Sequence, residues 1–335
     1  MSKRTKQGKI PSEISTIVRR DLTENVIIIG SGPAGCTAAI YTARAQLSPL
    51  LIAGPAVGGQ VALSNEVGNY PGFPEDINGM DLAQLMQQQA ERFGTRIEMD
   101  IVTRVDLSTR PFKVTTYGEE YETLALIVAT GGSPRKLEVA GEAEFAGRGV
   151  SYCATCDGFF YTDKEIVMVG GGDAAVEEAL FLTRYATRVR LIHRRDQLRA
   201  EKLLQEQAFR NDKITFVWNT VVTEVVGDRA VTGVRVRDVR TGEEGLIPTQ
   251  GVFVAIGWEP NASFLGGQLT LHDNGYIVAD KDGRTSVEGV WAAGDVCDWV
   301  YRQIATSVGA GCKAAIQAEA YIARLEGQAY PFRKG

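Results

Sequence analysis

The chain has 335 residues, 44% of them hydrophobic, which is enough for about two domains with cores of their own. Its formal charge of -5 and its pI near 5.4 argue against a general affinity for nucleic acid or for anionic membranes, because both favour a basic surface. No stretch approaches the roughly 20 apolar residues of a membrane-spanning helix, so no membrane association is expected.

Residues 1–20 are polar and basic and lack the apolar core of a secretion signal. We expect a flexible tail, with an interaction arm or a targeting role as the alternative. The chain is therefore predicted to be cytoplasmic. Its five cysteines are too few and too scattered for a disulfide framework, which a reducing cytosol would not sustain.

Residues 25–45, NVIIIGSGPAGCTAAIYTARA, carry the first nucleotide-binding pattern. A β-branched run typical of a buried parallel strand leads into Gly30, Gly32 and Gly35 at the G-x-G-x-x-G spacing, and a helix-forming run follows. In this pattern the first glycine permits a tight turn, the second lets a pyrophosphate approach the backbone, and the third lets the helix pack on the strand. The phosphates would lie at the positive end of the helix. A purely structural glycine-rich turn is the alternative.

A second copy of the pattern lies within residues 165–202, where Gly170, Gly172 and Ala175 occupy the three key places. At the tip of its next strand an NAD-binding unit would place an acid for the ribose 2′-hydroxyl. The sequence instead offers four basic residues there. Guanidinium groups match a 2′-phosphate, at roughly 1.5 to 3 kcal/mol for each charge-assisted contact, so NADPH is favoured over NADH. An ordinary solvated face is the alternative. The four are His193, Arg194, Arg195 and Arg199.

The first copy has neither an acid nor an arginine at the corresponding tip, which ends in Ala53 and Gly54. Its nucleotide must therefore be held by another segment, and a flavin adenine dinucleotide has a second half to bind. A strand-like run that begins at Thr285 reaches Gly294 and Asp295 and passes into a helix rich in small residues. Asp295 is a candidate acceptor for ribityl hydroxyls, and the positive end of the helix would face the flavin ring. A simple turn is the alternative.

The order of these motifs predicts an inserted domain, because the two flavin segments flank the second nucleotide pattern. We expect an α/β fold with two Rossmann-like dinucleotide-binding domains, the NADPH domain being inserted into a discontinuous FAD domain. The FAD domain is predicted at 21–133 and 262–335, and the NADPH domain at 134–261. Two glycine-ended runs, 125–134 and 251–260, are the predicted crossovers, and we expect them to form a hinge about which the domains rotate.

Cys153 and Cys156 form the one close cysteine pair. A structural zinc site needs four ligands, and the other cysteines and histidines include no second close pair, so no metal site is expected. A thioredoxin-like C-x-x-C would lie in its own βαβ pattern, whereas this pair precedes a dinucleotide-binding strand. With a flavin proposed in the other domain, a dithiol that accepts flavin electrons is the favoured interpretation. The remaining cysteines, expected to be packing residues, are Cys36, Cys297 and Cys312.

Asp157 directly follows the pair. Thiol and thiolate must interconvert when the disulfide is reduced, and a carboxyl group beside Cys156 can carry that proton. A helix-capping or surface role is the alternative for this aspartate.

Seven motifs together resemble the bacterial low-molecular-weight thioredoxin reductases over about residues 25–325. They are GSGPAG, GGQ, ATGGS, CATCDGFF, GGGDAAVEEA, HRRDQLRAEK and AAGDV followed by YRQ. The resemblance implies that NADPH reduces FAD, that FAD reduces the Cys153–Cys156 disulfide, and that the dithiol reduces thioredoxin. It implies that Cys156 faces the flavin while Cys153 attacks the partner, that a domain rotation separates the half-reactions, and that the protein is a homodimer.

The resemblance also assigns cofactor contacts residue by residue. For FAD it implies Gly30, Ser31, Gly32, Pro33, Ala34, Gly35, Ala53, Gly54, Gly59, Gln60, Asn69, Ala129, Thr130, Gly131, Gly294, Asp295, Val296, Arg302, Gln303 and Ile304. For NADPH it implies Gly170, Gly172, Asp173, Ala175, His193, Arg194, Arg195, Arg199 and Gly257. Phe159 and Phe160 are similar to the family's thioredoxin-docking aromatics, with a core role equally open.

Two features depart from the family pattern: the basic N-terminal extension, and Asp173, where some relatives carry asparagine. Three other functions are kept as alternatives. One is a flavin reductase for another small dithiol protein or for a peroxidase; the peroxidase-coupled type would carry an added thioredoxin-like domain, so a separate acceptor is expected. The others are a ferredoxin- or quinone-linked flavin reductase, in which the C-x-x-C would have no use, and a redox sensor without turnover.

Overall fold

The computed structural model describes residues 23–55 and 57–328. The predicted tail, residues 1–20, lies outside this part of the chain. Among the described residues no helix is long and apolar enough to cross a bilayer.

The chain divides into two compact units, one of which interrupts the other. The first unit contains residues 23–61, 82–131 and 260–328, and the second contains 62–81 and 132–259. Both are α/β, and this confirms the predicted fold class. The divisions after residues 131 and 259 fall within the two predicted crossover runs, whereas the grouping of 62–81 with the second unit differs from the expected continuous segment 21–133.

The first unit is built on a largely parallel sheet in the order β3-β2-β1-β6-β5-β4, with β17 paired to β6. Strands β3, β2, β1, β6 and β17 run parallel, and β4 and β5 are antiparallel to their neighbours. Helix α2 is counted with this unit although it starts in the 62–81 segment, and three of the elements are short 3-10 turns, labelled η. The elements are β1 (Thr23–Ile29), α1 (Pro33–Arg44), β2 (Leu50–Ile52), η2 (Gly59–Leu63), α2 (Gly79–Arg92), β3 (Arg96–Glu98), β4 (Val102–Asp106), β5 (Phe112–Thr116), β6 (Glu120–Val128), η4 (Ser263–Leu265), β17 (Val290–Ala292), η5 (Gly294–Val296) and α6 (Ile304–Leu325).

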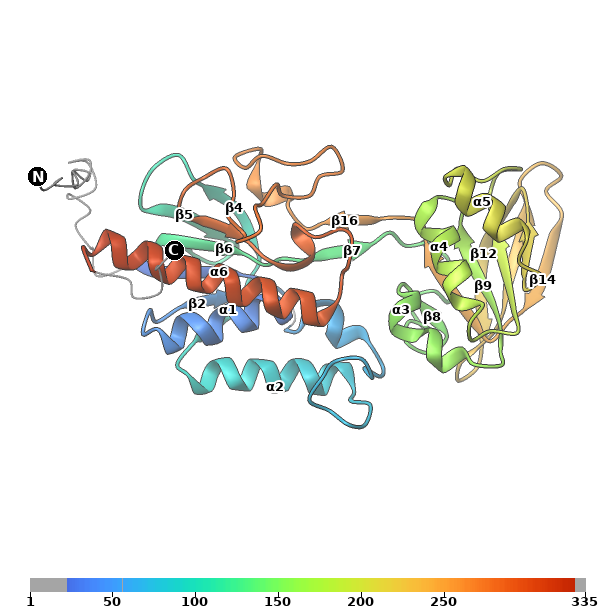
Figure 1. Cartoon of the computed structure of the whole chain (residues 1–335), viewed down its shortest axis with the longest axis horizontal. Coiled ribbons are helices and arrows are strands. Elements are labelled where there is room, and N and C mark those ends of the chain that lie inside the picture. Colours follow the sequence, from blue (N-terminus) through green and yellow to red (C-terminus); the bar gives the residue numbers. More distant parts are fainter. Residues whose placement is uncertain (1–22, 56, 329–335) are drawn as a thin grey trace, which may run out of the picture. The chain divides into compact units, whose positions relative to one another are not determined.

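Strand β1 explains why this sheet is buried on both faces. Val26 and Ile28 point into one core, while Ile27 and Ile29 point into the other, and each is at most 4% exposed. A β-branched run without polar alternation is what a strand covered on both faces requires. Helices α1 and α6 lie side by side over the first of these cores (Figure 1).

Helices α1 and α6 approach closely because the contact uses the smallest residues. A Cβ atom on Gly311 of α6 would lie 2.1 Å from the carbonyl oxygen of Ala34 in α1, so only glycine fits there. The crossing therefore lies within the first turn of α1, and it holds the start of that helix against α6.

The strand-like run that begins at Thr285 forms a strand only in its last part. Only Val290–Ala292 pairs with β6, and the residues before it form a loop. The Thr285 hydroxyl hydrogen-bonds to the carbonyl oxygens of Val287 and Val290, and Gly289 has a φ of 89°. These contacts close a tight loop where the alternating sequence predicted an extended chain.

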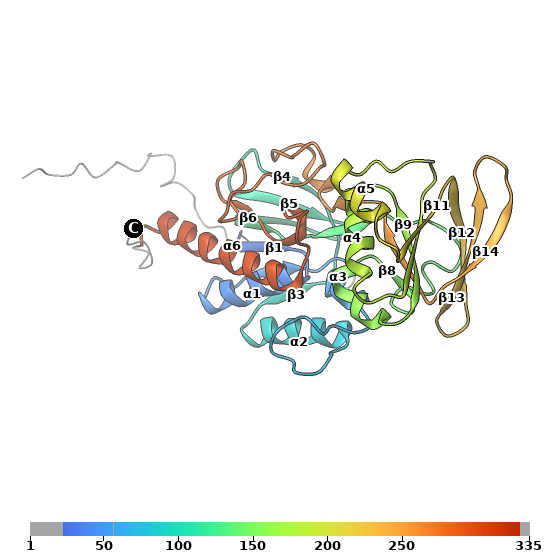
Figure 2. The same cartoon turned by 45° about the vertical axis from the view of Figure 1, so that its right-hand side comes forward.

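The second unit contains a wholly parallel sheet in the order β11-β10-β9-β15-β8 and an antiparallel ribbon, β12-β13-β14 (Figure 2). Alternate residues of β9 again point into two separate cores, Ile166 into one and Val167 into the other. The elements are β8 (Val150–Ser151), α3 (Ala154–Asp157), η3 (Gly158–Tyr161), β9 (Glu165–Gly170), α4 (Asp173–Leu182), β10 (Arg188–Ile192), α5 (Lys202–Phe209), β11 (Ile214–Val217), β12 (Thr220–Gly227), β13 (Val231–Asp238), β14 (Glu244–Pro248) and β15 (Gly251–Ala255).

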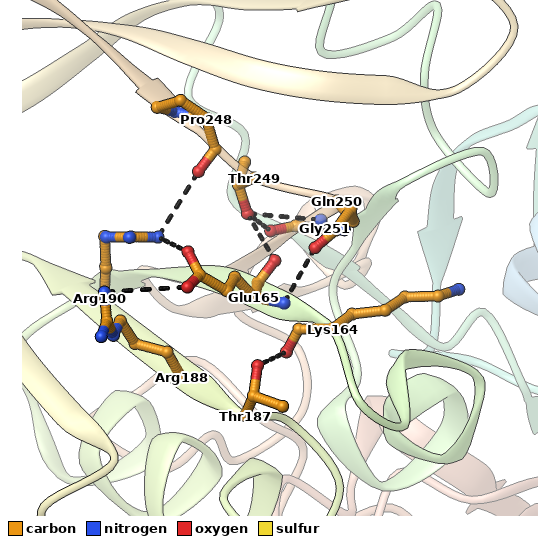
Figure 3. A network of polar contacts seen from close by, with 9 residues as sticks. All are labelled: Lys164, Glu165, Thr187, Arg188, Arg190, Pro248, Thr249, Gln250 and Gly251. Atoms are coloured by element: carbon orange, nitrogen blue, oxygen red, sulfur yellow. Dashed lines mark hydrogen bonds and ion pairs between the residues drawn. The ribbon is translucent and has the colours of Figure 1, made fainter.

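A polar network around Glu165 fixes the amino-terminal end of β9 (Figure 3). The Glu165 carboxylate lies 2.7 Å from the guanidinium of Arg190 on β10. Its backbone amide donates to Gln250 Oε1 at 2.8 Å, and its carbonyl accepts from the Thr249 hydroxyl at 3.0 Å. The network joins β9 to β10 and to the start of β15, so the three strands enter the sheet in a fixed register.

The two segments that join the units pair with each other as β7 (Gly132–Pro134) and β16 (Trp258–Pro260). An ion pair between Arg135 and Glu259 at 2.9 Å lies beside this ribbon. Both crossover runs predicted from the sequence therefore include a strand of this ribbon.

Candidate active site

The first nucleotide turn connects β1 to α1, and its three glycines have different surroundings. Gly30 has a φ of 105°, and a Cβ there would meet the Ala129 carbonyl oxygen at 2.4 Å. A Cβ on Gly35 would lie 1.8 Å from the Gly30 carbonyl oxygen, so the helix packs directly on the turn. Around Gly32 the nearest such contact is 4.0 Å away, which leaves the backbone open to an approaching group.

The start of α1 is suited to an anion. No side chain caps it, its first turn holds no acidic residue, and Pro33 occupies its first position. The free backbone amides and the helix dipole favour negative charge at such an end. The residues present therefore fit the diphosphate of a dinucleotide.

Several predicted flavin-site residues converge on this turn. The Ser31 hydroxyl donates to the Ala53 carbonyl oxygen at 3.0 Å and accepts from the Gly58 amide at 3.3 Å. A Cβ on Gly59 would lie 3.5 Å from Gly32. The tip of β2 and the loop at 58–59 are thus held next to the glycine turn.

Asp295 lies in η5, which follows β17. A Cβ on Gly294 would lie 2.9 Å from Ala34, so η5 packs against the start of α1. The Ser307 hydroxyl of α6 donates to Asp295 Oδ1 at 3.1 Å. Burial raises the pKa of Asp295 to about 6, against the opposing Ser307 hydrogen bond. A partly buried carboxylate with one hydrogen-bond donor has room for further donors, and the hydroxyls of a ribityl chain would supply them.

The remaining predicted flavin residues lie in three other places. The Thr130 hydroxyl donates to the Asn261 carbonyl oxygen at 2.6 Å, which ties the two crossovers together. Arg302 has a left-handed backbone, with a φ of 47°, and Gln303 occupies the N-cap position of α6 without a capping hydrogen bond from its side chain. Asn69 lies in the 62–81 segment, which groups with the second unit.

The second nucleotide turn connects β9 to α4 with the same backbone plan. A Cβ on Gly170 would meet the Ala255 carbonyl oxygen at 2.5 Å, and nothing lies within 4 Å of one on Gly172. Ala175, in the third place, is fully buried. The open glycine at the helix start again fits a diphosphate.

The arginine-containing loop after β10 is attached to this turn by two hydrogen bonds. The Arg199 amide donates to the Gly171 carbonyl oxygen at 2.7 Å, and the Glu201 amide donates to Asp173 Oδ1 at 2.7 Å. Asp173 therefore holds the loop with one carboxylate oxygen. Gly257, which was also predicted to contact NADPH, lies at the crossover, where its carbonyl oxygen accepts from the Arg135 amide.

Three exposed arginines, Arg194, Arg195 and Arg199, lie on this loop, and none forms an ion pair with another residue in the described ranges. Their guanidinium groups are therefore available to an external anion, as a 2′-phosphate requires. His193 is buried beneath the turn, 5% exposed, and a Cβ on Gly171 would lie 2.3 Å from its Nδ1. Burial and the nearby arginines lower the pKa of His193, so its imidazole is neutral at pH 7.

Cys153 and Cys156 are joined by a disulfide, with Cα atoms 5.3 Å apart, and they lie around the short helix α3. The Cys156 amide donates to Cys153 Sγ at 3.2 Å. After reduction this amide would stabilise a thiolate on Cys153, because a hydrogen bond to the charged form favours it.

Asp157 ends α3, and its carboxylate accepts a hydrogen bond from Ser151 at 2.5 Å. Burial raises the pKa of Asp157, and the Ser151 hydrogen bond opposes part of this shift. A carboxyl group whose pKa is raised toward neutrality suits proton transfer to and from thiols. Ser151 carried no role in the sequence interpretation, because only the fold of α3 brings it to Asp157.

Phe159 and Phe160 lie directly after this helix. The Phe159 side chain is 69% exposed and meets Phe160 and Tyr185 edge to face at 6.1 and 6.3 Å. The core alternative is therefore wrong for Phe159, while Phe160 is half-buried.

Two of the other cysteines are poor nucleophiles. Burial raises the pKa of Cys36 and of Cys297 to about 12. Cys312 lies on α6 and is half-buried. Neither Cys36 nor Cys297 therefore competes with the disulfide pair as a nucleophile.

Residues 24–314 match the family model described as pyridine nucleotide-disulphide oxidoreductase. The chain belongs to this family. It is 52% identical to a thioredoxin reductase of Rickettsia felis over 90% of this chain and 99% of that protein, and 52% identical to one of Mycolicibacterium smegmatis over 90% and 97%. The solved thioredoxin reductase of Streptococcus pyogenes has a TM-score of 0.87 and 41% identity, covering 91% of this chain and all of that one. Members of this family use a flavin and a pyridine nucleotide, and both nucleotide turns described above fit such groups.

Proposed function

We propose that the chain is a thioredoxin-disulfide reductase that uses NADPH and FAD. The observation that carries this proposal is the Cys153–Cys156 disulfide in the same unit as the second nucleotide turn. The relatives named thioredoxin reductase, about half identical over nine-tenths of the chain, support thioredoxin as the acceptor. The bound flavin would pass electrons from NADPH to the disulfide.

The chain's own residues account for the reaction with thioredoxin. A Cys153 thiolate, stabilised by the Cys156 amide, attacks one sulfur of the thioredoxin disulfide, and the other sulfur leaves as a thiolate. Asp157 in its protonated form gives that thiolate a proton. Asp157, now ionised, takes the proton of the Cys156 thiol, and the resulting Cys156 thiolate attacks Cys153 Sγ, which re-forms the intramolecular disulfide and releases the second thioredoxin thiolate.

FAD is proposed for the first turn and NADPH for the second. The open start of α1 and the half-buried Asp295 support a dinucleotide with a hydroxylated chain in the first unit. Arg194 and Arg195, exposed and without an ion pair among the described residues, support a 2′-phosphate, and hence NADPH, in the second.

The proposal includes the way in which the half-reactions alternate. The domains 21–133 with 262–335, and 134–261, rotate about the crossover ribbon, and Phe159 with Phe160 docks thioredoxin. The exposure of Phe159 supports docking. The enzyme acts as a homodimer in the cytoplasm. A disulfide crosslink between the two domains is expected to abolish thioredoxin reduction, and full turnover in the crosslinked protein would exclude rotation.

Stopped-flow absorbance tests the central proposal. NADPH should bleach the flavin band, and oxidised thioredoxin should restore it within one turnover. Cys153→Ser should abolish thioredoxin reduction and show a long-wavelength thiolate–flavin charge-transfer band, because Cys156 remains next to the flavin. Rapid reoxidation of the flavin by another disulfide but not by thioredoxin would exclude thioredoxin as the acceptor. A charge-transfer band in Cys156→Ser alone would reverse the roles proposed for Cys153 and Cys156.

A further inference from the structure

Ser151 makes a dense set of contacts at the redox site. It is the last residue of β8 and is 4% exposed. Its hydroxyl oxygen lies 2.5 Å from Asp157 Oδ2, 3.1 Å from the Cys153 amide nitrogen and 3.3 Å from the Cys153 carbonyl oxygen. One side chain thus contacts both the carboxyl group and the backbone of the first cysteine.

A hydroxyl group has one hydrogen to donate and can accept two. When Asp157 is ionised, Ser151 donates to its carboxylate and accepts from the Cys153 amide. When Asp157 is protonated, its O–H can donate to the second acceptor position of Ser151, and the serine hydrogen turns to the Cys153 carbonyl. Every group stays paired in both states, and no heavy atom has to move.

We propose that Ser151 is a positioning residue that holds Asp157 in one place in both of its protonation states. The inference rests on the proposed role of Asp157 as the proton donor. It explains how a half-buried carboxyl group can give up and regain a proton in each cycle without losing its hydrogen-bond partner, a loss that is costly away from water. Among the described residues, no second side chain hydrogen-bonds to Asp157.

One other titratable group is close enough to sense Asp157. Tyr161 in η3 has its pKa raised to about 12, first by burial and then by the charge of Asp157. It stays neutral over an ordinary assay range. Once the disulfide is reduced, Cys153 and Cys156 are the remaining nearby groups that titrate. Their ionisation affects the pH dependence of every variant compared below in the same way.

The test is the pH profile of thioredoxin reduction by Ser151→Ala holoenzyme. The acid must be protonated to act, so activity falls as the pH rises through the pKa of Asp157. Loss of the bond to its carboxylate should move this descending limb to higher pH by about one unit. The kcat at the optimum should fall about tenfold because the carboxyl group is no longer held. The rate of flavin reduction by NADPH should be unchanged, which also reports an intact fold.

Three matched variants separate the possible outcomes. Ser151→Thr keeps the hydroxyl group, and the descending limb of its pH profile should lie at the same pH as in the parent enzyme. Tyr152→Phe removes the adjacent hydroxyl, which donates to Glu142 and not to Asp157, and should leave the limb in place. In an Asp157→Asn background, Ser151→Ala should cost much less than in the parent.

Two results would overturn the inference in distinguishable ways. If Asp157→Asn leaves the limb and the rate unchanged, then the proposed role of Asp157 is wrong and the inference falls with it. If Asp157→Asn removes the limb but Ser151→Ala leaves both its position and the rate unaltered, then Asp157 is the acid and Ser151 does not position it.

Discussion

The two nucleotide turns share the same backbone arrangement and differ in the segments that surround it. Both run from a buried strand through an open glycine into an uncapped helix start. At the next strand tip the first turn has Ala53 and Gly54, and the second has a loop with three exposed arginines. The turn itself suits a diphosphate, and we propose that the neighbouring segments determine which dinucleotide binds.

The difference extends to how tightly each turn is closed. In the first turn the third position is Gly35, whose Cβ would collide with the Gly30 carbonyl oxygen. In the second turn the same position is Ala175, whose Cβ is accommodated in the core. The helix therefore approaches its strand more closely in the first unit.

The largest expected effect follows from this closure. Gly35→Ala would place Cβ 1.8 Å from the Gly30 carbonyl oxygen and should yield protein that is misfolded or free of flavin. Ala175→Gly, the matched change in the second turn, should cost only about 1 kcal/mol of stability and keep NADPH binding. Flavin absorbance per mole of purified protein measures both. A Gly35→Ala protein with full flavin content would show that the two turns tolerate the same residues.

Removing the arginines should have the next largest effect. Each guanidinium–phosphate contact is worth about ten- to a hundredfold in affinity, so replacing Arg194 and Arg195 with alanine should raise the KM for NADPH at least a hundredfold. The KM for NADH should change far less. Arg188→Ala, at the opposite end of the same strand, is the control and should leave both values near the parent. Equal losses for the two cofactors would contradict the 2′-phosphate assignment.

Asp295 gives the smallest of the three effects, and its sign is informative. Burial raises its pKa from 3.8 to about 6, so its ionisation destabilises the flavin-free fold as the pH rises between these values. Asp295→Asn should therefore stabilise flavin-free protein by about 1 to 3 kcal/mol at pH 7.5, and hardly at all at pH 4.

Urea unfolding midpoints at the two pH values check this prediction, together with an FAD titration in which the variant should bind more weakly. Asp173→Asn is the matched change in the second turn. The Asp173 carboxylate is exposed and accepts a hydrogen bond from the Glu201 amide, so Asp173→Asn should not raise the stability of the protein at pH 7.5. A stabilisation by Asp295→Asn that is the same at both pH values would contradict the proposed cause.

The sequence predicted the features that depend on short spacing. The strand–turn–helix units, the interrupted arrangement and the cysteine pair follow from neighbouring residues, and the fold confirms the first two. The features that the sequence did not predict depend on contacts between residues that only the folded chain brings together. The alternating run after Thr285 predicted a strand because its pattern says nothing of the loop that its own hydroxyl closes. Ser151 reaches Asp157 only because α3 turns back toward β8, which no periodicity reveals.

Two of the cysteines outside the redox pair, Cys36 and Cys297, bear on how this protein reacts with oxidants. Peroxides react with thiolates, and with pKa values of about 12 Cys36 and Cys297 hold almost none at neutral pH. Among these four cysteines, oxidative attack is then directed to the reduced Cys153–Cys156 pair, where a sulfenic acid on one sulfur can be resolved by the other. A lesion there regenerates the same disulfide that catalysis reduces, so damage and turnover share one repair route.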